Sequence, residues 1–177
     1  MSLKVLFLDI DGVLNSEQWE CYAHYCYQYN IYDNICTSKE PHIAYIETKI
    51  DDRAIIVLNW IINNTQCDIV LSSSWRSTDQ NEMNDLSTAL KNKGLIKDIF
   101  DITPRLIGEK YDGIRRGSEI QKWLNDNCLK YDIESYCIID DCIYDMLEEQ
   151  LNNIVTIDPR YGLTGVDADI IINTLNG

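Results

Sequence analysis

The sequence has few basic residues and no long apolar run. Its 177 residues include 15 Lys and Arg against 29 Asp and Glu, which gives a formal net charge of −14 at pH 7. A surface this acidic repels a polyphosphate backbone, so we expect no extended binding of nucleic acid. No apolar stretch approaches the roughly 20 residues of a membrane-spanning helix, so we expect no membrane partner.

Features of exported proteins are also missing. The seven cysteines are odd in number and form no Cys-x-x-Cys pair, which argues against a disulfide framework. Residues 1–8 lack the basic segment, the long apolar segment and the small-residue cleavage site of a signal peptide. We therefore expect a soluble, intracellular protein of the cytoplasm with free thiols.

Short apolar runs alternate with longer amphipathic segments in a chain that is 45% hydrophobic and 25% charged. Length and composition suit a single domain over residues 1–177. Strands are expected at residues 3–10, 68–72, 135–140 and 153–157, with a short strand within residues 96–102. Helices are expected at residues 51–64, 79–93 and 167–175, and from the capping-box pattern of Ser118 and Gln121 onward. This alternation predicts an α/β three-layer sandwich with a parallel, Rossmann-like sheet.

Residues 16–50 do not follow the alternation and are expected to form a small lid, or cap, inserted after the first strand. They contain five tyrosines between Tyr22 and Tyr32, three cysteines and both histidines. Stacking of these tyrosines on a base or sugar is one interpretation, and packing within the lid is the favoured one. A zinc site is disfavoured against buried thiols, because the ligand spacing matches no common zinc motif. Its ligands would come from Cys21, His24, Cys26, Cys36 and His42.

Acidic and hydroxyl side chains stand at the ends of three expected strands. Asp9 and Asp11 end the first, residues 72–74 are serines that end the second, and Asp140 and Asp141 end a third. Because the carboxyl ends of parallel strands meet at one edge of the sheet, we expect these residues to lie close together. Four carboxylates would repel one another there, and a divalent cation would remove that conflict. Their oxygen ligands predict a Mg²⁺ site.

The spacing of Asp9 and Asp11 suits a reaction that needs two carboxylates. Residues i and i+2 of an extended chain point to the same side, so one carboxylate can attack while the other moves a proton. Gly12 permits a sharp exit of the chain. The alternatives are an acidic turn or a calcium loop ending at Glu20, but Gly12 occupies the fourth position of such a loop, where glycine is needed at the sixth.

Four segments occur in the order typical of the haloacid dehalogenase (HAD) superfamily, which the chain resembles. They are DIDGVLN (9–15), VLSSSWR (70–76), RRGSEIQKWL (115–124) and IIDD (138–141). The later DPRYGLT (158–164) is similar to the small subgroup related to HAD domains of multi-domain RNA-repair proteins. The resemblance covers most of the chain except residues 16–50. It implies a HAD-like fold and a Mg²⁺-dependent phosphohydrolase that cleaves a phosphomonoester through an aspartyl-phosphate.

The resemblance also implies residue roles. Asp9 would be the nucleophile and a Mg²⁺ ligand. Asp11 would protonate the leaving group, then activate water, and would bind the metal through its backbone carbonyl. Ser72 would hydrogen-bond a phosphoryl oxygen, and Ser73 is a near competitor because one register slip exchanges them. The alternative for these serines is capping of the next helix.

The basic residue at the phosphoryl group would be Arg116, where the family usually has lysine, and an arginine fork binds oxygens differently. The alternatives at this position are Arg115 and Lys122, or a solvated arginine pair without a role at the site. Asp140 or Asp141 would complete the metal shell, with Asp145 as a weaker candidate. Trp75 is expected to pack beside a surface Arg76, although a phosphate contact by Arg76 is the alternative.

The substrate suggested by the resemblance and by the tyrosine-rich lid is a nucleotide or a nucleic-acid terminal phosphate. The net charge of −14 favours a small phosphorylated substrate over a long strand. The alternative class of function is a HAD-like binding or assembly module with little or no turnover, in which residues 16–50 would be a partner surface. The oligomeric state stays open.

Overall fold

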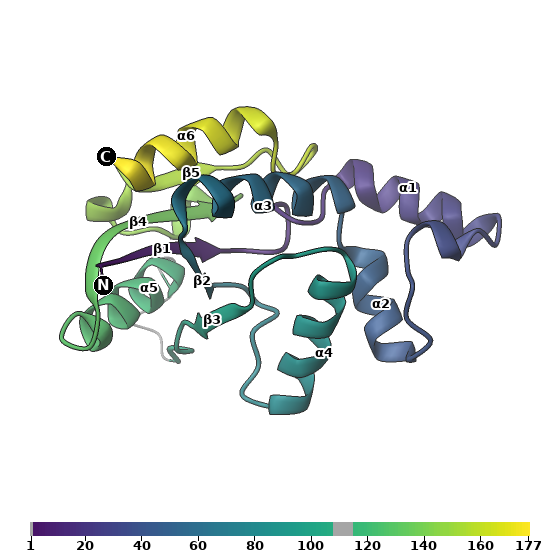
Figure 1. Ribbon diagram of the computed structural model, residues 1–177, viewed down its shortest axis with the longest axis horizontal. Helices are drawn as coiled ribbons and strands as arrows, with labels where there is room; N and C mark the ends of the chain where they lie inside the picture. The colour runs from purple at the N-terminus through teal and green to yellow at the C-terminus, as the bar shows by residue number, and fades with distance from the viewer. Residues whose placement is uncertain (1, 108–114) are drawn as a thin grey trace.

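The computed structural model describes residues 2–107 and 115–177, which form a parallel sheet between helices (Figure 1). Its five strands lie in the order β3-β2-β1-β4-β5, and all neighbouring pairs are parallel. They are β1 (Ser2–Leu8), β2 (Asp68–Leu71), β3 (Ile99–Ile102), β4 (Asp132–Asp140) and β5 (Ile154–Thr156). The predicted α/β class and Rossmann-like, HAD-like parallel sheet are confirmed.

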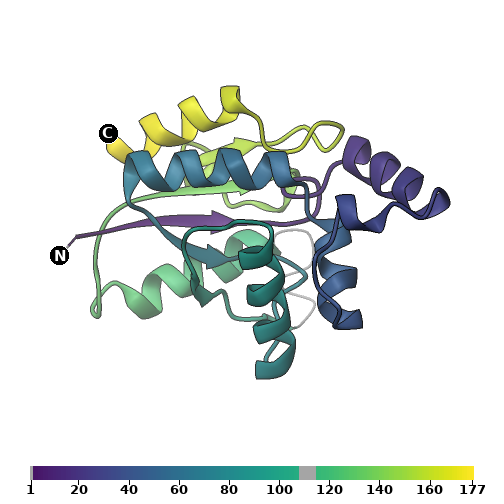
Figure 2. The ribbon, with the colours of Figure 1, turned by 45° about the vertical axis from the view of Figure 1, so that its right-hand side comes forward.

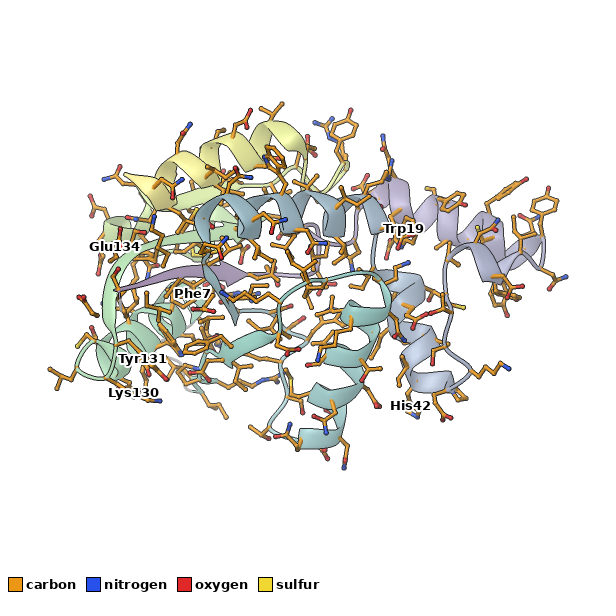
Figure 3. All side chains as sticks on the ribbon, in the orientation of Figure 1. Phe7, Trp19, His42, Lys130, Tyr131 and Glu134 are labelled. Atoms are coloured by element: carbon orange, nitrogen blue, oxygen red, sulfur yellow. The ribbon has the colours of Figure 1, made fainter. Side chains whose placement is uncertain are left out.

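The central strand β1 is buried because its side chains alternate between two apolar cores. Leu6 and Leu8 belong to the larger core, and Val5 and Phe7 belong to the smaller core on the opposite face. All four are fully buried, as the continuous apolar run predicted. Phe7 lies in the interior of the molecule in Figure 3.

Helices cover both faces of the sheet (Figures 1 and 2). α3 (Asp52–Thr65), α4 (Gln80–Asn92) and α6 (Gly165–Asn176) contribute to the larger core. α5 (Arg115–Asn127) packs Ile120 and Trp123 into the smaller core, with the Trp123 ring edge-on to Phe7 at 5.4 Å. Short 3₁₀ turns, η3 (Ile143–Asp145) and η4 (Glu148–Gln150), connect β4 to β5.

The predicted start of α5 at Ser118 was wrong. The helix already includes Arg115, three residues earlier, and Ser118 lies inside it. Its first turns are held by long-range packing, since Gln150 donates a hydrogen bond of 2.9 Å to the Gly117 carbonyl. A Cβ at Gly117 would lie 2.6 Å from the Leu147 nitrogen, so only glycine permits this approach. A local capping pattern contains none of this information.

Residues 16–50 fold into α1 (Glu17–Gln28), η1 (Tyr32–Asn34) and α2 (Pro41–Lys49), which lie beyond the carboxyl ends of the strands (Figure 2). Their small core consists of Trp19, Cys26 and Ile35. Trp19 lies near the start of α1 (Figure 3) and donates a hydrogen bond of 2.9 Å to the Thr48 carbonyl, which joins α1 to α2. Glu47 accepts a hydrogen bond of 2.6 Å from Asn92, which joins α2 to α4.

The tyrosines of this segment are more exposed than the packing interpretation predicted. Tyr25 and Tyr29 form one ring pair and Tyr27 and Tyr32 another, at 4.6 and 5.4 Å between centroids. Tyr27 nevertheless exposes 66% of its surface. Among the described residues, the cysteines and histidines of the segment form no metal-binding group, and its cysteines are free. None of the helices in the described ranges is both long and apolar enough to cross a membrane.

Candidate active site at the carboxyl ends of the strands

The ends of three central strands are level with one another. Leu8 is in register with both Leu71 and Ile139. Past these residues, the Asp9 amide donates to the Ile139 carbonyl at 3.0 Å, and the Ser72 amide donates to the Leu8 carbonyl at 2.8 Å. The positions of the candidate functional residues at the end of each strand are therefore fixed by hydrogen bonds between the strands.

Asp9, Asp140 and Asp141 form a compact group that we call the acidic centre. Each offers a carboxylate oxygen, and these oxygens lie within 4.8 Å of one another. Asp9 and Asp140 are only 4% and 2% exposed. Burial raises the pKa of the Asp9 carboxyl, and burial together with the charge of Asp9 raises the pKa of Asp140 to about 7. Three acids held this close carry a charge conflict, so their oxygen donors fit a divalent cation such as Mg²⁺.

Gly12 allows Asp141 to approach the first strand. Its φ is +72°, in the left-handed region, and a Cβ built there would lie 2.6 Å from Asp141 Oδ2. No L side chain fits this position without displacing Asp141. The glycine that follows Asp11 in the sequence is thus required both for the turn and for the position of a carboxylate from another strand.

Asp11 lies outside the acidic centre and is held by a separate set of donors. Its Oδ1 accepts hydrogen bonds from Trp75 Nε1 at 2.9 Å and Asn15 Nδ2 at 3.0 Å. Its Oδ2 accepts from Ser74 Oγ at 3.1 Å. The Asp11 carboxylate is therefore engaged by donors of its own, and it is not among the three carboxylates that form the acidic centre. The sequence reasoning missed these three donors, although all of them stand inside the quoted motifs.

The two serines proposed for phosphate binding are both buried but differ in their contacts. Ser72 is 1% exposed, and its Oγ has no hydrogen-bond partner among the described residues. Ser73 Oγ accepts a hydrogen bond from the Trp75 amide at 3.3 Å, and the interaction of Ser73 with Asp9 offsets part of the rise that burial causes in the pKa of that acid. A buried hydroxyl without a partner is costly unless something binds it, so Ser72 is the better placed donor for a ligand oxygen.

Among the basic candidates, Arg116 contacts the acidic centre. Its Nη1 lies 3.5 Å from Asp9 Oδ1, and its Nε lies 3.5 Å from Asp140 Oδ2. Lys122 instead pairs with Asp126 at 2.8 Å on the exposed side of α5. Arg115 and Asp145 line a neighbouring cavity, and Asp145 is not part of the acidic centre among the described residues.

The expectation of a surface Arg76 was wrong. Its side chain is 6% exposed and forms an ion pair with Glu119, which is itself 4% exposed. The Arg76 guanidinium also donates to the Ser73 carbonyl. Burial lowers the pKa of Arg76, while the charge of Glu119 raises it. The pair joins the loop after β2 to α5, a contact between residues 43 positions apart that no local pattern indicates.

Comparison with known proteins gives one result. A family model described as a HAD domain in Swiss Army Knife RNA repair proteins matches residues 5–168. Searches of the curated proteins and of the solved structures found no match. The matched range contains every segment on which the resemblance was based, and it confirms that resemblance.

Proposed function

Because the chain belongs to the family of HAD domains found in Swiss Army Knife RNA repair proteins, we propose that it is a Mg²⁺-dependent phosphohydrolase. Its substrate would be a phosphomonoester, either a nucleotide or a nucleic-acid terminal phosphate. The single observation that carries this proposal is the acidic centre with Arg116 beside it. Buried acids with one adjoining cation, at the end of a central strand, suit phosphoryl transfer, which needs positioning and charge stabilisation.

In the first step, an oxygen of the Asp9 carboxylate attacks phosphorus, and the bond from phosphorus to the leaving oxygen breaks. Asp11 gives its proton to that leaving oxygen, which departs as an alcohol. In the second step, Asp11 takes a proton from water, whose oxygen attacks phosphorus and frees Asp9 and inorganic phosphate. The Ser72 hydroxyl and the Arg116 guanidinium hold the phosphoryl oxygens, and Ser73 orients Asp9.

The carboxylates of Asp9, Asp140 and Asp141 would hold Mg²⁺, with the Asp11 carbonyl as a further ligand. Bound Mg²⁺ supplies positive charge that offsets the charge on the phosphoryl oxygens. We further propose that residues 1–177 form one domain, with residues 16–50 as a lid over the strand ends. A lid at this position would exclude water and select the substrate.

The experiment that tests the proposed function is phosphate release from an aryl phosphate with Mg²⁺, with an EDTA control. Asp9→Asn should abolish release while the melting midpoint stays close to that of the unchanged protein. The matched control is Asp169→Asn, because Asp169 is an exposed acid on α6. Phosphate release by the Asp9→Asn variant would contradict the assignment of Asp9 as the nucleophile. The absence of release from aryl phosphates, nucleotides and phosphorylated oligonucleotides would contradict the proposed enzymatic activity.

A second candidate function is a binding or assembly module with residues 16–50 as the partner surface. The observation that favours it is the exposure of Tyr25, Tyr27 and Tyr29, at 51%, 66% and 58%. Both candidates allow Mg²⁺ to raise the melting midpoint, because any ligand of the folded state does so. Only turnover separates them, and the intact acidic centre favours the enzyme.

A further inference from the structure

A basic cavity, which we call the arginine pocket, adjoins the acidic centre. It has a volume of about 290 Å³, and its walls include Arg76, Arg105, Arg115 and Arg116. Four of the 15 basic residues of the chain thus line one small cavity, in a protein with a net charge of −14. Among the residues that the structure describes, the carboxylates on its walls are Glu119 and Asp145. Such a local excess of positive charge attracts an anion in spite of the acidic surroundings.

The arginine pocket and the acidic centre share residues. Arg116 lines the pocket and also contacts Asp9 and Asp140. Ser74 lines the pocket and donates to Asp11. The two sites therefore adjoin, so one molecule can place a phosphoryl group at Asp9 and a second group in the pocket.

The walls of the arginine pocket are fixed by contacts between three segments. Arg105 donates a hydrogen bond of 2.9 Å to the Ser74 carbonyl and another to the Arg76 carbonyl. Glu119 is committed to the Arg76 ion pair and accepts from the Leu106 amide at 2.9 Å, so its charge is already compensated. The Nε of Arg76 is buried and has no partner among the described residues. A preorganised set of guanidinium groups is the arrangement that binds phosphate oxygens best.

We propose that the arginine pocket binds a second phosphate group of the substrate, the phosphodiester next to a terminal phosphate of a nucleic-acid strand. This inference rests on the proposed function, since the terminal phosphate would be the group cleaved at Asp9. The volume lies at the small end of ligand cavities, so it holds one phosphate with part of a sugar and not a long strand. The site would thus bind the terminus of a nucleic-acid strand, while the acidic surface around it repels the rest of that strand.

The test is a comparison of binding to thymidine 3′,5′-bisphosphate, thymidine 5′-monophosphate and thymidine 3′-monophosphate by calorimetry. The full chain carries Asp9→Asn throughout, so that turnover does not consume the probes. We expect the bisphosphate to bind about tenfold more tightly than either monophosphate, or about 1.4 kcal/mol. Arg115→Gln should remove most of this preference, because Arg115 is an exposed wall residue whose replacement leaves the core intact.

The matched control is Lys122→Gln, which removes an exposed positive charge from the same helix outside the pocket and should keep the preference. Equal binding of all three probes, or equal losses in the two variants, would overturn the arginine pocket as a phosphate site. Dithymidylate phosphorylated at its 5′ or its 3′ end distinguishes a strand from a free bisphosphate. The strand is overturned as the ligand when neither dinucleotide binds more tightly than the monophosphates.

Phosphate release by the unmutated chain is measured in parallel, so that the two proposals fail separately. Tighter binding of the bisphosphate without any phosphate release would contradict the proposed phosphohydrolase activity and still support the arginine pocket as a phosphate site. Release without the preference would overturn the pocket alone. Where the bisphosphate binds more tightly than the monophosphates, high salt should reduce this difference, because screening reduces attraction between exposed charges.

Discussion

The indole nitrogen of Trp75 donates a hydrogen bond of 2.9 Å to the carboxylate of Asp11. The two residues are 64 positions apart, on the loops that follow β2 and β1. Trp75 also packs partly against the larger core, which fixes its ring. The orientation of the proposed general acid therefore depends on a partly buried aromatic residue that itself has no chemical role.

The first prediction concerns this contact. Trp75→Phe keeps most of the ring packing but removes the N–H donor. We expect kcat for an aryl phosphate to fall up to about tenfold, since a hydrogen bond contributes about 0.5–1.5 kcal/mol. KM should change little, because Trp75 orients Asp11 and does not bind phosphate. Trp60→Phe, at an exposed tryptophan of α3, should leave kcat unchanged, and equal kcat values in both variants would exclude this role for Trp75.

The second prediction concerns the approach of Gly12 to Asp141. Gly12→Ala adds a Cβ that lies 2.6 Å from Asp141 Oδ2 and must displace this carboxylate. We expect Mg²⁺ to lose most of its effect on the melting midpoint. Gly94→Ala is the matched control, because Gly94 also has a positive φ, +96°, but a Cβ there meets nothing within 4 Å. Both variants should lose about 1–2 kcal/mol of stability, because an L residue is strained in the left-handed conformation, and only Gly12→Ala should lose the Mg²⁺ response.

The third prediction concerns the buried ion pair of Arg76 and Glu119. Glu119→Gln leaves the buried guanidinium without its counter-charge, so the free energy of unfolding should fall by about 3 kcal/mol. Urea denaturation measures this change. Asp126→Asn removes one partner of the exposed pair with Lys122 and should cost less than about 1 kcal/mol. Losses of similar size in the two variants would contradict the burial of the first pair.

The fourth prediction concerns Cys137 on β4. Burial raises the pKa of this thiol to about 12, above the value of about 8.5 in an unfolded chain. Below pH 8.5 the thiol is protonated in both states and stability is unaffected. Between about pH 8.5 and 12 only the unfolded state loses the proton, so the free energy of unfolding should fall as pH rises.

The measurement for Cys137 is urea denaturation between pH 8 and 10 on the unchanged protein and on Cys137→Ala, which should show a smaller decline with pH. A thiol reagent offers a second readout. Cys128 is exposed and should react at once, whereas Cys137 is fully buried and should react only when the chain unfolds. Rapid reaction of Cys137 in the folded protein would contradict its burial.

Sequence patterns predicted the elements that build the sheet, because a buried parallel strand is a continuous apolar run that ends where the polar residues begin. This is why the sequence alone was enough to assign Asp9 and Asp140 to one edge of the sheet. The short strand expected within residues 96–102 is confirmed as Ile99–Ile102, and Ile96, which is 55% exposed, is not part of the sheet. Periodicity identifies an apolar run but not which of its residues find a neighbouring strand.

The candidate site was predicted only in part. The acids that follow β1 and β4 come together because strand order and register bring them there. The donors to Asp11 were missed because Trp75 and Ser74 reach it through a contact between two loops. A local sequence pattern does not indicate which side chains of distant loops form hydrogen bonds. Arg76 was assigned to the surface because arginine is usually exposed, and only its encounter with Glu119 makes burial tolerable.

The sequence by itself determined the parallel α/β sheet and the acids at its edge, since both follow from local runs of apolar residues and from the residue types that end them. The tertiary structure alone decided that Arg116 contacts those acids, whereas Lys122 pairs with Asp126 on the exposed side of the helix. It also decided that four arginines gather into one cavity. Both results depend on how α5 is rotated against the sheet, which is fixed by the packing of Trp123, Ile120 and Gly117 against residues distant in the chain.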